Sequence, residues 1–224
     1  YTRLKRDEVI ENNIRAGDVI VGLASHGQTT YENQYNSGIG SNGLTMARHE
    51  VLSHDYARQY PETFDPAIGE ELAYTGKQQL TDKVANTNQS VGELLLSPTR
   101  TYLPVLSAIF KELKPEIHGI IHNTGGGQTK VKNFIKDLHV IKNDLFDLPE
   151  VFRLIREQTG TDWREMYQVF NMGHRMELYV DEMHAQKIID LARAFGIDAK
   201  VIGNCEANDG EKVTVKSASG SFEY

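Results

Sequence analysis

Short runs of aliphatic residues recur along the chain, and each predicts a buried strand. After Asp18, the run to Ala24 has no polar interruption, which is typical of strands in a core, and Ile117–Ile121 is predicted to be another buried strand. Met176–Val180, Ala199–Ile202 and Val213–Val215 are predicted to be strands in the last third of the chain. With an amphipathic helix after Val180, the chain is predicted to end in the order strand, helix, strand, strand.

Between these runs the apolar side chains recur every three or four residues, which predicts helices. Strands and helices in this order predict an α+β fold with α/β/α layers, in which helices cover a mixed sheet. The first expected helix starts near Ser41, is capped by Ser41 or Asn42, and runs through Val51 toward Tyr56. The second covers Leu106–Leu113, and the third runs from Pro149 to Gly160. The last two run from the cap Asp162 to Val169 and from the cap Asp181 to Gly196.

Two long stretches lack such periodicity. Ser25–Gly40 is rich in Gly, Ser, Asn, Gln and Thr and is predicted to be a loop at the surface. Loops of this length are uncommon unless they have a function. Pro61–Gln89 is polar and is predicted to be irregular.

Composition narrows the class of protein. The chain has 224 residues, 39% hydrophobic and 25% charged, which is ordinary for a globular protein. A net charge of −7 argues against a nucleic-acid partner. No window approaches the roughly 20 apolar residues of a membrane helix, and Tyr1–Arg15 is too polar for a signal peptide. We therefore expect a cytoplasmic protein with no membrane partner.

The single cysteine, Cys205, cannot form an internal disulfide, and no Cys/His spacing is typical of a structural zinc site. We expect a buried or half-buried thiol and no metal site.

The sequence HNTGGG at His122–Gly127 carries the clearest candidate chemistry. Three successive glycines let backbone amides approach a ligand such as a phosphate closely. His122, at the end of a predicted strand, can transfer protons near neutral pH. The alternative is a tight turn in which His122 only hydrogen-bonds its own loop.

Other candidates have two interpretations each. Arg100 and Arg175 could bind a phosphate, although an exposed arginine is the commoner case. His174 and Arg175 are expected to precede the Met176 strand. Ser25 and His26 lack a positioned acid, which argues against a nucleophilic triad.

Five segments together resemble one family, and their order and spacing match. GDVIVGLAS (17–25), GSNGLTMAR (40–48), LLSPTRTY (95–102), IHNTGGGQT (121–129) and MYQVFNMG (166–173) resemble the C-terminal half of AIR synthase, the phosphoribosylformylglycinamidine cyclo-ligase family. The resemblance runs from about Arg6 to the end.

The resemblance implies an activity in purine biosynthesis. In this family ATP activates the amide oxygen of formylglycinamidine ribonucleotide, and the ring then closes to aminoimidazole ribonucleotide with release of ADP and phosphate. An N-terminal domain carries most of the site for ATP and Mg²⁺ and pairs the subunits as a homodimer. The chain resembles the second domain only, so we expect residues 16–224 to form that domain and 1–15 to be a linker from the N-terminal domain. Alone, the chain is expected to be inactive and mostly monomeric.

The resemblance also implies roles for individual residues. His122 is the expected catalytic residue, transferring a proton. The expected substrate- or phosphate-binding residues are Ser41, Asn42, Gly43, Arg100, Thr124, Gly125, Gly126, Gly127, Asn171 and Gly173.

The chain departs from the family at three places. Gly40 stands where many members have a histidine, an insertion of about Gln28–Gly38 precedes it, and His174–Arg175 replaces a small or apolar pair. His26 could serve in place of the histidine. We therefore do not transfer the detailed substrate contacts of the family to this chain.

Two alternatives stay open. One is a related superfamily enzyme, such as thiamine-monophosphate kinase, selenophosphate synthetase or formylglycinamidine synthetase. The other is a non-catalytic binding or assembly module. The FNMG and PTRTY segments favour the cyclo-ligase.

Overall fold

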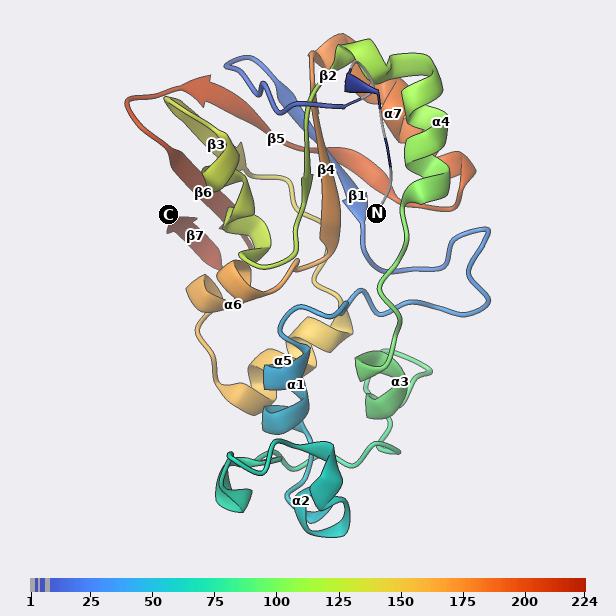
Figure 1. Cartoon of the computed structure of the whole chain (residues 1–224), viewed down its shortest axis with the longest axis vertical. Helices are drawn as coiled ribbons and strands as arrows, with labels where there is room; N and C mark the ends of the chain where they lie inside the picture. Colours follow the sequence, from blue (N-terminus) through green and yellow to red (C-terminus); the bar gives the residue numbers. More distant parts are fainter. Residues whose placement is uncertain (1–2, 4, 7–8) are drawn as a thin grey trace.

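Seven strands form one mixed sheet in the computed structural model, which describes residues 3, 5, 6 and 9–224 (Figure 1). The strand order is β2-β4-β1-β5-β3-β6-β7, and neighbours are antiparallel except for the parallel pair β3 and β6. The strands are β1 (Val19–Ala24), β2 (Ile117–His122), β3 (Leu138–Lys142), β4 (His174–Val180), β5 (Ala199–Ala207), β6 (Lys212–Ser217) and β7 (Gly220–Glu223). The predicted α+β class is confirmed, whereas β3 and β7 were not expected.

Helices cover both faces of the sheet. On one face α4 and α7 pack over alternate residues of the central strands, such as Val21 and Leu178, in one buried cluster. On the other face η5 packs against β6, and α6 packs against η5. The helices are α1 (Leu44–Val51), α2 (Asp55–Gln59), α3 (Val91–Leu95), α4 (Leu103–Leu113), α5 (Glu150–Thr159), α6 (Trp163–Val169) and α7 (Glu182–Ala194), with 3-10 helices η2 (Pro61–Thr63), η3 (Glu70–Leu72), η4 (Lys114–Glu116) and η5 (Gly127–Phe134).

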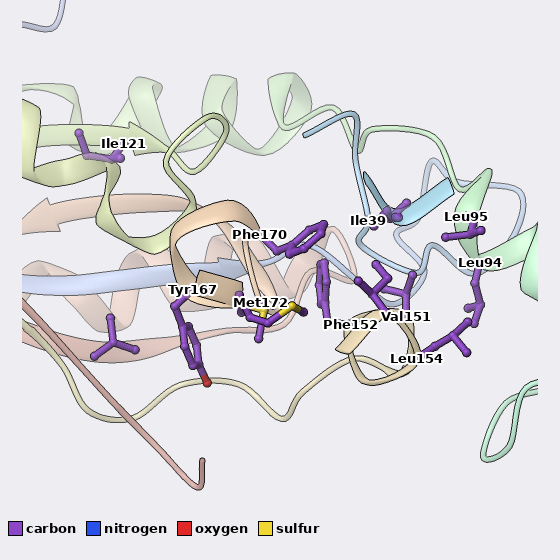
Figure 2. Close-up of a cluster of buried hydrophobic side chains, with 14 of the residues drawn as sticks. Ile39, Leu94, Leu95, Ile121, Val151, Phe152, Leu154, Tyr167, Phe170 and Met172 are labelled. Atoms are coloured by element: carbon purple, nitrogen blue, oxygen red, sulfur yellow. The ribbon is translucent and has the colours of Figure 1, made fainter. Parts of the chain in front are cut away.

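A second buried cluster joins the sheet to the smaller helices beyond its end (Figure 2). Phe170, just after α6, packs against Phe152 of α5 with ring centroids 5.6 Å apart. Ile39, Leu94 of α3, and Val151 and Leu154 of α5 belong to the same cluster (Figure 2). The cluster therefore holds the loop that contains Ile39 and the turn after α6 together with helices α3 and α5.

The Ser25–Gly40 segment is a loop, as its polar composition predicted, but only its middle lies at the surface, where Gln28, Thr30 and residues 33–35 are exposed. Its two ends are buried. Ser25 and Ser37 are 0% and 1% exposed, and Ile39 is buried in the second cluster. The polar groups find partners inside the protein: the Ser37 hydroxyl donates to the Leu94 carbonyl at 2.7 Å, and the Asn36 amide donates to the Pro98 carbonyl at 2.8 Å. A polar segment can be buried when its groups are satisfied in this way.

Helix ends follow the predicted signals in two places and depart from them in a third. Asp162 caps α6 by accepting a bond from the Glu165 amide at 3.0 Å, and Gly160 ends α5 with φ +68°. Neither Ser41 nor Asn42 caps α1, because Gly43 holds the N-cap position at φ +71°. The helix also ends at Val51, and Tyr56 belongs to the separate helix α2.

The segment before β1 lies partly outside the described residues, so the expected linker 1–15 is described from Val9 onward. Asn13 donates its amide to the His118 carbonyl at 2.6 Å, and the Asn12 side chain accepts the Ile120 amide at 2.9 Å. These residues therefore run along the outer edge of β2. In the described part of the chain, no helix has the length and apolar character needed to cross a bilayer.

Cys205 lies on β5 and should be nearly inert in the folded protein. It is 2% exposed, and burial, together with the nearby carboxylates of Asp18 and Glu177, raises its pKa to about 12. Because the thiolate is the reactive form, we expect a disulfide reagent at pH 8 to label the native chain far more slowly than the urea-unfolded chain. Equal rates in the two states would contradict this burial.

Candidate functional site

Three segments distant in sequence meet around the turn Phe170–His174 at one end of the sheet. Ser25, after β1, donates its hydroxyl to the Asn171 side-chain oxygen at 2.7 Å. The Asn171 amide donates to the Gly38 carbonyl at 2.8 Å. Gln128, after the glycine loop, donates to the backbone carbonyl of Asn171. The structure thus brings together the Ser25–Gly43 segment, the glycine loop and the FNMG turn.

Asn171 is the centre of this arrangement and is 4% exposed. Its side-chain oxygen also accepts the Gly173 amide at 3.1 Å. Since most of its hydrogen-bonding capacity is used within the protein, the observed role of Asn171 is to join the three segments. Its predicted contact with substrate stays a prediction.

The glycine loop leaves β2 at His122 and enters η5 (Figure 1). Gly125, Gly126 and Gly127 have φ of +39°, +103° and +49°, which L-residues with a side chain rarely adopt. The amides of Gly125 and Gly126 donate to no residue in the part of the chain that the structure describes. The Lys130 ammonium donates to the Thr124 carbonyl, at the start of these glycines, at 3.0 Å. Unpaired amides beside a cation can bind an anion.

His122 is exposed at the end of β2, and its ring lies edge-on to the Tyr102 ring at 6.5 Å. Partial burial and the charges of Arg175 and Lys130 lower its pKa below the ordinary value. The imidazole is therefore neutral near pH 7 and can accept a proton.

An NMR titration of the His122 ring protons should give a pKa below about 6.5. Protonation of His122 opposes folding, because the unfolded chain binds this proton more readily. That penalty is fully present below the folded pKa and disappears as the pH rises to the unfolded value. Lys130→Met should raise the pKa of His122, since it removes one of the two nearby cations. An unchanged titration would show that Lys130 does not act on this ring.

A buried polar network lies beneath the glycine loop. The carboxylate of Glu177 accepts hydrogen bonds from Lys142, from His174 at 2.9 Å, from Asn123 at 2.7 Å and from Tyr179 at 2.7 Å. Glu177 and Lys142 are both 0% exposed.

Burial alone would raise the pKa of Glu177, but the charge of Lys142 and the hydrogen bond from His174 hold it well below its usual range. Burial lowers the pKa of Lys142, and the facing carboxylate opposes that shift. With four donors on Glu177, the pair is ionised at neutral pH. Lys142 also donates to the Gln128 carbonyl at 2.7 Å, so the network holds both ends of the glycine loop, at Asn123 and at Gln128.

The predicted residues before α1 lie close to the same turn. The Asn42 amide donates to the Val169 carbonyl at 3.3 Å, and its side-chain oxygen lies 3.9 Å from where a Cβ on Gly125 would stand. Ser41 is exposed. A Cβ on Gly43 would lie 2.3 Å from the Phe170 ring, which explains the glycine there. Whether Ser41 and Asn42 contact a ligand stays a prediction.

Arg100 is committed to the fold. Its guanidinium donates five hydrogen bonds, to the carbonyls of Ala24, His26 and Gly27 and to both oxygens of Glu32, and its side chain is 0% exposed. No N–H remains for a phosphate. The geometry therefore places Arg100 among the residues that hold the Ser25–Gly40 segment, not among those that contact a ligand.

The sequence interpretation singled out His174 and Arg175 but placed them wrongly. Both belong to β4 and are 0% and 2% exposed, instead of preceding the strand at the surface. We expected the strand to begin at Met176 because the two residues before it are polar. In the structure both of these side chains are buried, and the strand begins at His174. Lys142 and Glu177 were missed for the same reason.

One cluster among the described residues has the geometry of a metal site, and it lies at the opposite end of the sheet. Ligand atoms of Asp18, His118 and Asp181 lie within 4.8 Å of one another. The Arg15 guanidinium lies 3.2 Å from Asp181 and 2.8 Å from the His118 ring nitrogen. This cluster already holds a cation, so we assign it no metal.

Cavities occur away from the glycine loop. One of about 530 Å³ is lined by residues that include Tyr35, Gln89 and Glu150. Another, of about 270 Å³, is mostly apolar and lies among Tyr56, Tyr60 and other residues of the helical part. The unpaired amides beside His122, and not cavity size, mark the candidate site.

Comparisons with known proteins show the family to which the chain is related. The family described as AIR synthase related protein, C-terminal domain, matches residues 15–216. Phosphoribosylformylglycinamidine cyclo-ligase of Methanobrevibacter smithii is 32% identical over 216 residues, covering 96% of this chain and 53% of that protein. The Methanopyrus kandleri enzyme of the same name is 32% identical over 208 residues, covering 93% of this chain and 49% of that protein. The chain thus spans about half the length of these curated relatives.

A solved structure supports the fold. The hydrogenase maturation protein HypE superposes with a TM-score of 0.52 at 16% identity, covering 95% of this chain and 53% of that chain. At this identity the likeness concerns the fold alone.

Proposed function

Since the chain belongs to the AIR synthase related family, matching its C-terminal domain, we propose that it acts in the ATP-dependent ring closure of formylglycinamidine ribonucleotide to aminoimidazole ribonucleotide. We propose further that residues 16–224 form the C-terminal domain of this cyclo-ligase. ATP and Mg²⁺ would bind mainly to an N-terminal domain, which would also form the homodimer. The proposal is supported by the names and extents of the relatives.

One structural observation supports roles for particular residues. The unpaired backbone amides of the glycine loop follow His122, whose imidazole is neutral near pH 7. The amides of Gly125 and Gly126, with the Lys130 ammonium, fit a phosphate group. The loop would hold the phosphate of the ribonucleotide or the phosphate released during the reaction. Thr124 and Gly127 set the two ends of this loop.

Ring closure requires a proton acceptor. When bound, ATP supplies a phosphoryl group that makes the amide oxygen of the substrate a leaving group. An amidine nitrogen of the substrate forms the new C–N bond, the C–O bond breaks with release of phosphate, and the nitrogen loses a proton. His122 would accept that proton, because its lowered pKa leaves the imidazole unprotonated at neutral pH.

The first test is calorimetry of the 224-residue chain with formylglycinamidine ribonucleotide. We expect binding, and we expect Gly126→Val to abolish it because a branched side chain at φ +103° would disturb the loop. His122→Ala should weaken binding and abolish turnover in the two-domain enzyme. Unchanged binding in both variants would exclude the proposed site. Binding of ATP without the ribonucleotide would favour a related superfamily enzyme.

The second test is ADP release in the presence of ATP, Mg²⁺ and the ribonucleotide. We expect no release by the chain alone, and release once an N-terminal domain of a cyclo-ligase is supplied. Turnover by the chain alone would contradict the proposed division of the site between domains. Light scattering should show a monomer, because the proposed dimer contacts belong to the N-terminal domain.

A further inference from the structure

Arg175 is a buried cation without an acidic partner. Its residue is 2% exposed, and its Nη2 donates to the Gly38 carbonyl at 2.9 Å. Its Nη1 is buried with no hydrogen-bond partner. Among the described residues, no carboxylate forms an ion pair with it. A buried charge is costly unless it is paired, and an unpaired one at a candidate site calls for a missing anion.

Arg100 provides the internal comparison. It is equally buried, but it pairs with Glu32 at 2.8 Å and uses every donor. The charge and the donors of Arg100 are therefore all satisfied within the protein. Arg175 keeps an unused donor and has no counter-charge among the described residues. Burial lowers the pKa of Arg175, and Arg100 adds to that shift because it is a like charge.

Arg175 lies between the two glycine segments. Its carbonyl accepts the Asn123 amide at 2.6 Å, which places it beside the start of the glycine loop, and its charge reaches His122. On the other side, a Cβ on Gly40 would stand 2.0 Å from Arg175 Nη2. Gly40 has φ +62° and precedes the N-terminus of the eight-residue helix α1, where no side chain caps the amides. A guanidinium, two glycine segments and a helix N-terminus thus converge.

We propose that Arg175 is an anion-binding residue of this site, that it takes a phosphate-type oxyanion, and that Gly40 is required because the guanidinium occupies the space of a side chain there. The assignment rests on the proposed function only for the identity of the molecule that carries the phosphate. A guanidinium can donate two parallel hydrogen bonds to such an oxyanion. Nη1 is the donor left for the oxyanion, since Nη2 already donates to the Gly38 carbonyl.

The test uses the 224-residue chain with inorganic phosphate, measured by thermal unfolding and by calorimetry. Phosphate should raise the Tm of the wild type in a concentration-dependent manner. Arg175→Met should weaken phosphate binding by about tenfold or more, as expected for loss of a charged hydrogen bond. In phosphate-free buffer the variant should be at least as stable as the wild type, because it lacks the uncompensated charge. A variant that is less stable yet keeps the phosphate response would overturn the proposal.

If Arg175→Met does not fold, two further variants test whether Arg175 binds phosphate. Gly40→Ala should lose the phosphate response because its methyl group would displace the guanidinium. Gly27→Ala is the matched control, since Gly27 lies in the preceding loop at φ +94° but a Cβ there would meet no atom within 4 Å. Full phosphate affinity in Gly40→Ala, or equal loss in both variants, would count against the assignment.

Competition separates the possible sources of the phosphate. Inorganic phosphate should be displaced by formylglycinamidine ribonucleotide if Arg175 binds the substrate phosphate, and by ATP with Mg²⁺ if it binds the nucleotide. If Arg175→Met binds the ribonucleotide normally while Gly126→Val does not, the inference fails and the proposed function stands. If Arg175 binds phosphate but the chain does not bind the ribonucleotide, the inference stands and the proposed function fails.

Discussion

Lys142→Met should lower the free energy of unfolding by about 3–5 kcal/mol, because it leaves the buried carboxylate of Glu177 without its counter-charge. Both side chains are 0% exposed, and Lys142 also donates to the carbonyl and to the side-chain oxygen of Gln128, the latter at 3.1 Å. Urea denaturation of the wild type and the variant measures the loss. A difference below about 1 kcal/mol would mean that the pair contributes no more than a surface ion pair.

Lys187→Met is the matched control. Lys187 lies 2.7 Å from Glu112, but the two side chains are 51% and 46% exposed. The same substitution there should cost less than about 1 kcal/mol. Comparison of the two variants therefore separates the effect of burial from that of the charge pair itself.

The pH dependence should change in a definite direction. The pKa of Glu177 is lowered in the folded state, so its ionisation stabilises the protein above the unfolded pKa, and this stabilisation is lost as the pH falls toward the folded pKa. Lys142→Met should raise the pKa of Glu177, and stability should then fall less steeply between neutral and acidic pH.

Gly127→Ala should destabilise the protein by about 3 kcal/mol or more, since both backbone strain and steric overlap oppose it. A Cβ at this position would stand 2.5 Å from the Tyr167 carbonyl oxygen and 2.6 Å from that of Phe170, at φ +49°. Backbone atoms cannot move aside as a flexible side chain can. The variant should also lose ribonucleotide binding, which calorimetry would detect at a temperature where it remains folded.

Gly125→Ala, two residues earlier, is the control for that substitution. Gly125 has φ +39°, and a Cβ there would have only the Asn42 side-chain oxygen within 4 Å, at 3.9 Å. The expected cost is about 1–2 kcal/mol, from the left-handed backbone alone. Equal losses in the two variants would show that the contact with the turn after α6 is not what fixes the loop.

The elements that the sequence predicted well are those with a regular apolar pattern and a recognisable end. Helix α7 has Ala185, Ile188 and Ala192 on its buried face, and helix α5 ends at Gly160. Local sequence decides such elements, because the same residues set both the pattern and the cap.

Strand β3 could not be predicted in the same way. It alternates buried and half-buried residues, but one of its buried positions is Lys142, whose ammonium is satisfied only by Glu177 and Gln128 from elsewhere in the chain. The burial of both ends of the Ser25–Gly40 loop could not be predicted for the same reason. A buried polar residue looks like a surface residue until its partners are known.

The sequence predicted which segments come together better than it predicted the contacts of each residue. His122, the glycine loop and the FNMG turn do come together, since strand ends and glycine segments are visible in a sequence. Arg100 and Arg175 could not be told apart, because the difference between them is whether an acidic residue such as Glu32 lies within reach. Only the folded chain provides that information.

The position of β1 in the sheet has a consequence for synthesis of the protein. Among the strands of this sheet β1 is made first, yet both of its neighbours, β4 and β5, are made only after β2 and β3. The centre of the sheet therefore cannot close until β5 has been made, and β1 must wait with its aliphatic residues exposed. Chaperone binding to nascent chains should accordingly begin soon after β1 emerges and end only once β5 has been made.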